Sequence, residues 1–297
     1  MLYNTDVGKA KEGGIPLGIL SDILSGDVNA LINLLYQIPV ILIALTLHEV
    51  AHGYVAYKCG DPTAKMLGRL SLNPLHHLDP IGTLAMVLMG FGWAKPVPVN
   101  SRNFKHFRRD DILVSVAGIT VNFCLFLFSS FLIVLVQQFI FTPEFYHAIY
   151  FGALPPEILS ELPALPQIEL LSMKGNFTGL TMANDAMTLL SEYGLTEYVK
   201  TPWLMYVQRF LMYFSLTNLG LALFNLLPIP PLDGYHLFND ILFRGKLRIP
   251  AKVVQGISLA FVAVLLLTDY VSIGLGYVRN FIQDGVIRGI LWIFGVQ

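Results

Sequence analysis

The stretch Leu47-His48-Glu49-Val50-Ala51-His52-Gly53 lies inside a long apolar run, residues 31–57. If the run is helical, the two histidines are one turn apart and roughly 40° apart around the axis, so both can bind one metal ion. Glu49 stands beside the first histidine, close enough to act as a general base on a water at that ion. The stretch therefore predicts a metal centre built on one helix.

The apolar surroundings give this short motif its weight. Ionisable side chains are costly within a membrane and mark functional sites there by default. This run carries three of them within the five residues from His48 to His52. A structural role for the motif, in packing or in helix pairing, is the alternative.

Composition places the chain in a membrane. Of its 297 residues, 55% are hydrophobic and 13% are charged, and the charged share is about half of the roughly 25% typical of soluble domains. Such hydrophobicity excludes intrinsic disorder. The formal net charge of -1 leaves no basic excess to neutralise phosphates, so nucleic acid is not an expected partner.

Four apolar runs are long enough to cross a bilayer as helices, which takes roughly 20 residues. They are residues 31–57, 112–141, 204–229 and 249–267, the last of which can extend to residue 277. A fifth piece, residues 81–93, is too short to cross and contains three glycines, so it predicts a re-entrant element. The predicted fold is an all-α membrane protein, a polytopic bundle of about four core transmembrane helices with a short re-entrant, β-hairpin-like element.

Basic residues set the expected orientation. Eight lysines and arginines lie between Lys58 and Arg109 and four lie within residues 244–252, whereas residues 142–201 hold two lysines and seven acids. The positive-inside rule places the first two segments in the cytoplasm and the third outside. We therefore expect a multi-pass membrane protein whose metal centre lies toward the cytoplasmic side.

The spans divide the chain into five expected segments. They are an N-terminal extracytoplasmic segment (1–30), a first half of the core with the metal-binding helix, the re-entrant element and the second span (31–141), an extracytoplasmic insertion (142–201), a second half of the core (202–277) and a C-terminal interfacial segment (278–297). The insertion is too long for a simple loop, and it is either a connector or a lid over an active site.

Zinc needs a third protein ligand and an open position for water. The third apolar run is followed by Pro228-Ile229-Pro230-Pro231-Leu232-Asp233-Gly234, which puts Asp233 at the expected cytoplasmic side. His236 competes for the same role three residues further on. The residues alone leave both open as the third ligand.

Several motifs together make the chain similar to a known family. They are His48-Glu49-x-x-His52, a loop over residues 68–83, the segment Trp93–Asn100, Gly118-x-x-x-Asn122 and the run Asn225–Gly234. The chain resembles the site-2 protease family of intramembrane zinc metalloproteases, most closely its compact prokaryotic members. The resemblance covers about residues 44–239 without the insertion, and it departs from the family at Ile119, where proline is usual.

The resemblance implies an activity and the residues that carry it. One Zn²⁺ per chain would be held by His48, His52 and Asp233, in preference to His236, with Glu49 as the catalytic base. The substrate would be a transmembrane protein cleaved in or near its membrane segment, in a prokaryotic cell membrane. The roles expected of two asparagines are hydrogen bonds to the substrate backbone or the oxyanion, with a helix–helix hydrogen bond as the alternative; they are Asn122 and Asn225.

Three points stay open at this stage. An extended substrate could pair with residues 84–100 as an edge strand. A metal transporter or sensor would also place histidine and aspartate in spans, although it has no need of Glu49 beside the first ligand. A catalytically silent membrane scaffold would keep the same ligands.

Overall fold

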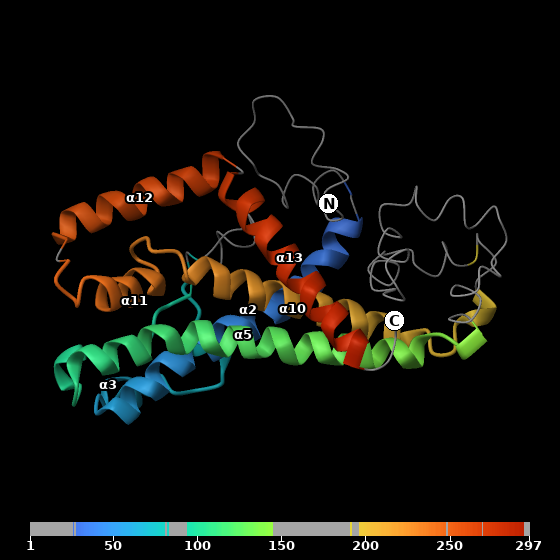
Figure 1. Cartoon of the computed structure of the whole chain (residues 1–297), viewed down its shortest axis with the longest axis horizontal. Helices are drawn as coiled ribbons and strands as arrows, with labels where there is room; N and C mark the ends of the chain where they lie inside the picture. Colours follow the sequence, from blue (N-terminus) through green and yellow to red (C-terminus); the bar gives the residue numbers. More distant parts are fainter. Residues whose placement is uncertain are drawn as a thin grey trace. The chain divides into compact units, whose positions relative to one another are not determined.

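The computed structural model describes residues 28–80, 94–144, 196–247, 249–268 and 270–293, together with positions 26, 82 and 191. This part of the chain consists of helices joined by turns (Figure 1), and it contains two isolated β-bridges but no strand. The all-α prediction is confirmed at this level. The expected re-entrant element lies outside the described residues except for Gly82, and so does most of the insertion.

Two long helices match the first two predicted spans. Helix α2 is Val28–Cys59, which begins three residues before its predicted run and ends two residues after it. Helix α5 is Phe107–Ile140, which begins five residues before its predicted run and ends one residue before it. Both are long and apolar enough to cross a membrane. Helix α2 stops where Gly60 takes a φ of 112°, a backbone conformation that side chains disfavour.

The third predicted span is not confirmed. Helix α10 is Trp203–Asn225, but it is not among the described helices that are apolar enough to cross. The reason is a set of buried polar residues along it, which lower its hydropathy while facing protein; they are Gln208, Arg209, Ser215 and Asn218. The prediction rested on the length of the apolar run, and a membrane-spanning role for α10 stays a prediction.

The fourth predicted span is a bent pair of helices. Helix α12 is Ala251–Leu267 and helix α13 is Tyr270–Ile293, and their axes differ by 76°. The described residues therefore hold two helices that are long and apolar enough to cross a membrane, or three if this pair counts as one span. The predicted number of four core spans is not confirmed.

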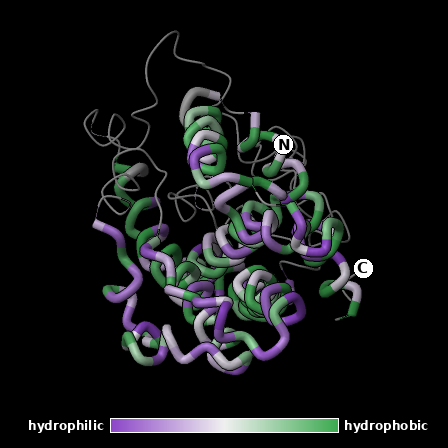
Figure 2. The backbone as a smooth tube through the Cα atoms, turned by 90° about the vertical axis from the view of Figure 1, so that its left-hand side faces the viewer, coloured by the Kyte–Doolittle hydropathy of each residue, from purple (hydrophilic) through white to green (hydrophobic). Residues whose placement is uncertain are grey.

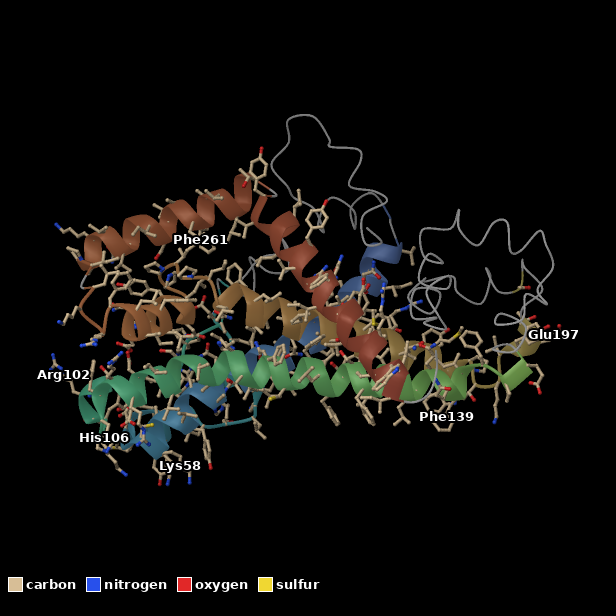
Figure 3. The ribbon with its side chains drawn as sticks, viewed as in Figure 1. Lys58, Arg102, His106, Phe139, Glu197 and Phe261 are labelled. Carbon is tan, nitrogen blue, oxygen red and sulfur yellow. The ribbon has the colours of Figure 1, made fainter. Side chains whose placement is uncertain are left out.

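Short elements complete the described part. They are α3 (Thr63–Met66), η1 (Pro74–His76), η2 (Ser101–Asn103), η3 (Thr196–Tyr198) and α11 (Asp233–Leu242). Figure 2 looks toward the end where α2 finishes and α5 starts, and the connecting segments there are largely hydrophilic. Lys58, Arg102 and His106 lie at this end (Figure 3), as expected if it faces the cytoplasm.

The chain forms two compact units. Of the described residues, the first unit holds those up to residue 126 and those from 216 to 281, and the second holds those from 127 to 215 and those from 282 onward. The first unit holds every predicted site residue. Its core uses many small side chains, which let membrane helices approach closely; those that are buried include Ala44, Ala56, Ala64, Ala117 and Ala222.

Asp61 fastens the loop that follows α2. Its carboxylate is fully buried and accepts hydrogen bonds from the Thr63 backbone and hydroxyl, from Asn100 N–H at 2.7 Å and from the Asn103 amide at 2.8 Å. Burial raises the pKa of Asp61, but these hydrogen bonds outweigh it and hold the pKa below its ordinary value. One carboxylate thus ties residues 100–103 to the end of α2.

We expect Asp61→Ala to lower the free energy of unfolding by about 2–3 kcal/mol at pH 7, because it leaves buried donors without an acceptor. The folded-state pKa lies below the unfolded one, so this contribution is complete above roughly pH 4 and is lost as pH falls through the folded-state pKa. Thermal unfolding in detergent, at pH 7 and at a pH below the folded-state pKa, measures the difference in stability between the variant and the wild type. Asp61→Asn keeps one acceptor and should lose less, and equal losses in the two variants would contradict this account.

Candidate metal centre

Helix α2 brings two histidines together in the interior of the first unit. His48 and His52 are 5% and 8% exposed, and their Nε2 atoms lie 3.0 Å apart. Their rings meet edge to face with centroids 4.6 Å apart. The predicted one-turn spacing is therefore realised with both Nε2 atoms turned to one point.

Asp233 reaches the same point from the first turn of α11. Its Oδ2 lies 3.2 Å from His48 Nε2 and 3.1 Å from His52 Nε2. Gly234 makes this approach possible, because a Cβ there would collide with the carbonyl oxygens of Leu226 and Leu227. His236 is exposed and packs against Tyr235, away from this cluster.

The three ligand atoms fit a zinc ion. His52 Nδ1 lies 2.7 Å from the Val114 carbonyl oxygen, so Nδ1 carries the proton and Nε2 keeps its lone pair. Asp233 Oδ2 is buried and makes no hydrogen bond among the described residues, although both Nε2 atoms are near it. Three lone pairs that meet without a proton need a cation, and two imidazoles with one carboxylate suit zinc with an open position.

Asn122 supports His48 from α5. It is fully buried, and its amide nitrogen lies 3.2 Å from His48 Nδ1, while its Oδ1 has no partner among the described residues. Exchanging the two amide atoms lets Oδ1 accept from His48 Nδ1–H, which satisfies the buried oxygen and leaves Nε2 free for a metal. This position favours a contact with His48, and the contact with substrate expected from the sequence stays a prediction.

The face of α5 that meets the histidines has a spacing of four. Val114 contacts His52, Asn122 contacts His48, and Gly118 lies midway between them. A Cβ on Gly118 would overlap both imidazole rings. Helix α5 thus provides one hydrogen-bond partner for each ring. Between these partners, the absence of a side chain on Gly118 leaves room for both rings.

Glu49 lies beside the ligands on α2 and is half-buried. Its Oε2 accepts a hydrogen bond of 2.7 Å from the backbone N–H of Val97. Asn225, the last residue of α10, donates its amide to the Leu221 carbonyl of the same helix at 3.0 Å. The expected role of Asn225 toward the substrate is not tested by this contact.

Other histidines stand apart from the cluster. His77 is buried in its loop, where Nε2 lies 2.7 Å from the Ser71 carbonyl oxygen, while His76 and His106 are exposed. His147 lies outside the described residues. The partners that sequence reasoning missed are the backbone groups of Val97 and Val114, which have no side-chain signature.

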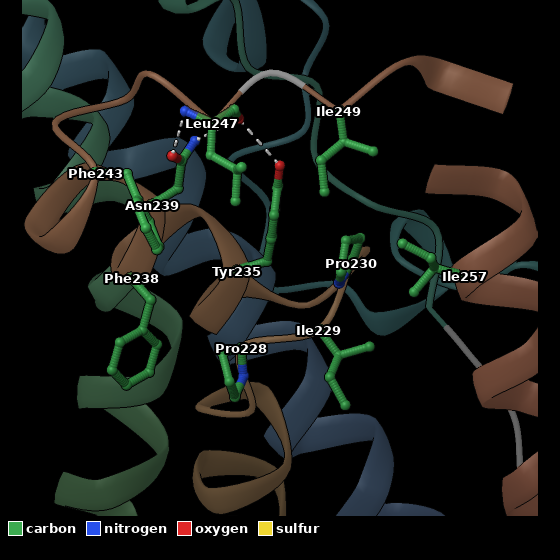
Figure 4. Close-up of a pocket in the computed structure, with 10 residues that line it drawn as sticks. All are labelled: Pro228, Ile229, Pro230, Tyr235, Phe238, Asn239, Phe243, Leu247, Ile249 and Ile257. Carbon is green, nitrogen blue, oxygen red and sulfur yellow. Dashed lines mark hydrogen bonds between the residues drawn. The ribbon is translucent and has the colours of Figure 1, made fainter. Parts of the chain in front are cut away.

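An apolar cavity of about 250 Å³ lies on the loop that leads to Asp233 (Figure 4). Residues 228–230, α11, residues 243–249 and α12 line it, and no member of the metal cluster does. Its polar edge is closed by the Tyr235 hydroxyl, which donates to the Leu247 carbonyl, and by Asn239, which bonds both backbone groups of Leu247. The cavity is therefore separate from the metal centre.

Comparison with known proteins decides the family. The profile of Peptidase family M50 matches residues 36–268, which include the whole cluster and Glu49. The chain belongs to Peptidase family M50. This is the site-2 protease family, so the M50 membership and the apolar helices make the chain a membrane-associated metalloprotease.

A curated relative points the same way. The chain is 35% identical over 232 residues to a protein of Bacillus subtilis (strain 168) whose name is "Putative zinc metalloprotease YwhC". The aligned residues cover 78% of this chain and 79% of that protein. No solved structure matches the chain significantly. Family and relative both suggest zinc, in agreement with the chemistry of the three ligand atoms.

We expect Gly118→Ala to weaken zinc binding by at least ~10-fold, because the added methyl group overlaps both histidine rings. Gly220→Ala is the matched control, since a Cβ at that helical position meets nothing within 4 Å. Zinc content of the purified proteins, measured by mass spectrometry with a chelator titration, compares them. Equal zinc affinities in the two variants would contradict the close approach of α5.

Asn122 offers a second test of the same geometry. Asn122→Leu removes the acceptor for His48 Nδ1–H and should weaken zinc binding about 10–100-fold, whereas Asn122→Asp keeps an acceptor and should retain affinity. Chelator competition measures both. If Asn122 acts only on the substrate, Asn122→Leu will lower activity and leave zinc affinity at the wild-type value.

Proposed function

We propose that the protein is an intramembrane zinc metalloendopeptidase that hydrolyses peptide bonds in or near transmembrane segments of membrane-protein substrates, in regulated intramembrane proteolysis. The observation that carries the proposal is the meeting of His48, His52 and Asp233 beside Glu49, on a helix apolar enough to cross a membrane. Membership of the M50 family supports it.

The proposed chemistry uses the chain's own groups around one Zn²⁺. When bound by His48, His52 and Asp233, zinc supplies Lewis acidity that lowers the pKa of water and polarises a carbonyl group. Glu49 takes a proton from water as the water oxygen attacks the scissile carbonyl carbon. Glu49 then returns a proton to the amine nitrogen as the carbon–nitrogen bond breaks.

Depth in the membrane defines the substrate class. His48 lies eleven residues before the last residue of α2, Cys59, which is about 16 Å along the axis. If the basic end of α2 faces the cytoplasm of a prokaryotic cell, hydrolysis occurs below that surface of the cell membrane. A helical substrate must unwind locally there, because its peptide groups are otherwise bonded within the helix.

Further parts of the chain have proposed roles toward the substrate. Asn225 ends α10 eight residues before Asp233 and is our candidate for a hydrogen bond to the substrate backbone or the oxyanion. Asn122 is a weaker candidate, because it is buried against His48.

Two other functions explain less. A metal transporter needs ligands along a path, whereas the three ligand atoms here lie within 4.8 Å of one another. A catalytically silent scaffold has no need to hold Glu49 beside the ligands with a hydrogen bond from Val97. The proposal of a protease accounts for both observations.

We expect Glu49→Gln to retain zinc and to lower peptide hydrolysis by about 10²–10⁴-fold, the usual contribution of a general base. Cleavage of a candidate transmembrane substrate in proteoliposomes and zinc content in the same preparation measure the two effects. His48→Ala is the comparison variant and should lose both. Full cleavage by Glu49→Gln would contradict the protease, and zinc uptake into the vesicles would favour the transporter.

A further inference from the structure

The hydrogen bond between Glu49 and Val97 joins two segments that are 48 residues apart in the sequence. At 2.7 Å between Oε2 and the backbone nitrogen, it has the length of a bond in which the acceptor is charged. It occupies one carboxylate oxygen of Glu49, and the other oxygen makes no hydrogen bond within the described part of the chain. A bond of this kind restricts the rotation of the carboxylate that is proposed to move the proton.

The sequence makes the amide of Val97 the single backbone donor of residues 96–98. Pro96 and Pro98 have no backbone N–H, so residues 96–98 contain one amide hydrogen. Pro98 also restricts Val97 to extended backbone, and each proline fixes its own φ. The Pro-Val-Pro sequence therefore presents one donor on a backbone with little freedom.

Packing holds this donor against α2. Val97 is 7% exposed, and its Cγ1 would lie 2.9 Å from a Cβ on Gly53, one helical turn beyond Glu49. The absence of a side chain on Gly53 allows the segment to come this close. On either side, Lys95 N–H donates to the His77 carbonyl at 2.8 Å and Asn100 N–H donates to Asp61 at 2.7 Å.

We propose that the backbone N–H of Val97 is the positioning donor for Glu49 and that the sequence Pro96-Val97-Pro98 serves to aim it. This inference rests on the proposed function, in which Glu49 is the base. It also limits which backbone amides could bond a substrate strand, in the pairing that the sequence predicts for residues 84–100. The amides of Lys95, Val97 and Asn100 are used within the protein, which leaves Val99 as the one non-proline amide of residues 95–100 available to a substrate.

Amide hydrogen exchange tests the bond without any need for catalysis. Since Val97 has the only exchangeable backbone hydrogen of residues 96–98, a peptide that isolates this stretch reports on it alone. Glu49→Ala removes the acceptor and should speed this exchange about tenfold or more relative to the wild type. Glu49→Gln keeps an amide oxygen and should preserve protection, so equal exchange in all three proteins would overturn the proposal.

Kinetics test the positioning role. Val97→Pro removes the N–H and should lower kcat about 10–100-fold with KM and zinc content unchanged, while Val97→Ala keeps the N–H and should keep most of kcat. Val99→Pro adds a proline beside Pro98 while keeping the Val97 N–H, and it should raise KM and leave kcat largely unchanged, because the amide it removes is the one available to a substrate. A raised KM at constant kcat in Val97→Pro would assign Val97 to substrate docking, and an equal loss in Val97→Ala would assign the effect to the side chain. Either result would overturn the proposal.

The two experiments separate this proposal from the proposed function. If Glu49→Gln abolishes hydrolysis but Val97→Pro does not lower kcat, the protease stands and the positioning role fails. If no peptide hydrolysis is found in the wild type, the exchange experiment still decides whether the Val97 amide is bound to Glu49. Should Val97→Pro lose its zinc or fail to fold, the comparison of Glu49→Ala with Glu49→Gln remains decisive.

Discussion

Two helices hold the metal centre: His48 and His52 lie four residues apart on α2, and their partners on α5, Asn122 and Val114, lie eight residues apart with Gly118 midway between them. His48 and His52 on α2 each need a partner at Nδ1, because only then does Nε2 keep the lone pair that binds a metal. Helix α5 runs antiparallel to α2 at this point, so Val114 meets His52 and Asn122 meets His48. The rest of the site depends on this pair of contacts. Asp233 can share a metal ion with the histidines, and Glu49 can act beside that ion, only where the two Nε2 atoms converge.

Close approach of backbone is the second constraint. Three glycines of the first unit stand where a Cβ would collide, and each serves a different partner of the site. Gly118 leaves room for the two rings, Gly53 admits the segment of Val97, and Gly234 admits the loop before Asp233. A glycine in a helix costs about 1 kcal/mol relative to alanine, so these positions weaken the helices that carry them. In return, the absence of side chains at these positions allows the close contacts around the metal ligands and the base.

The features that could be predicted from the sequence are those that depend on the type and spacing of side chains. The motif of α2 and its apolar run predicted that helix to within a few residues, and Asp233 was among the two candidates for the third ligand. The third span, on α10, is not confirmed, because Gln208 and Arg209 lower the hydropathy of that run. The sequence could not predict the amide of Val97, because every non-proline residue has one and only the fold determines where it points.

Ile119 shows why the spacing on α5 matters more than the residue types around it. The resemblance expects proline at this position, yet α5 runs without interruption from Phe107 to Ile140 and Ile119 is buried in it. Isoleucine keeps the N–H that a proline would remove, so the helical ladder continues past the site. Gly118 and Asn122 remain on one face because they are four residues apart, which sets Asn122 against His48 and Gly118 against both rings. Val114, four residues before Gly118, completes this face with its carbonyl oxygen 2.7 Å from His52 Nδ1.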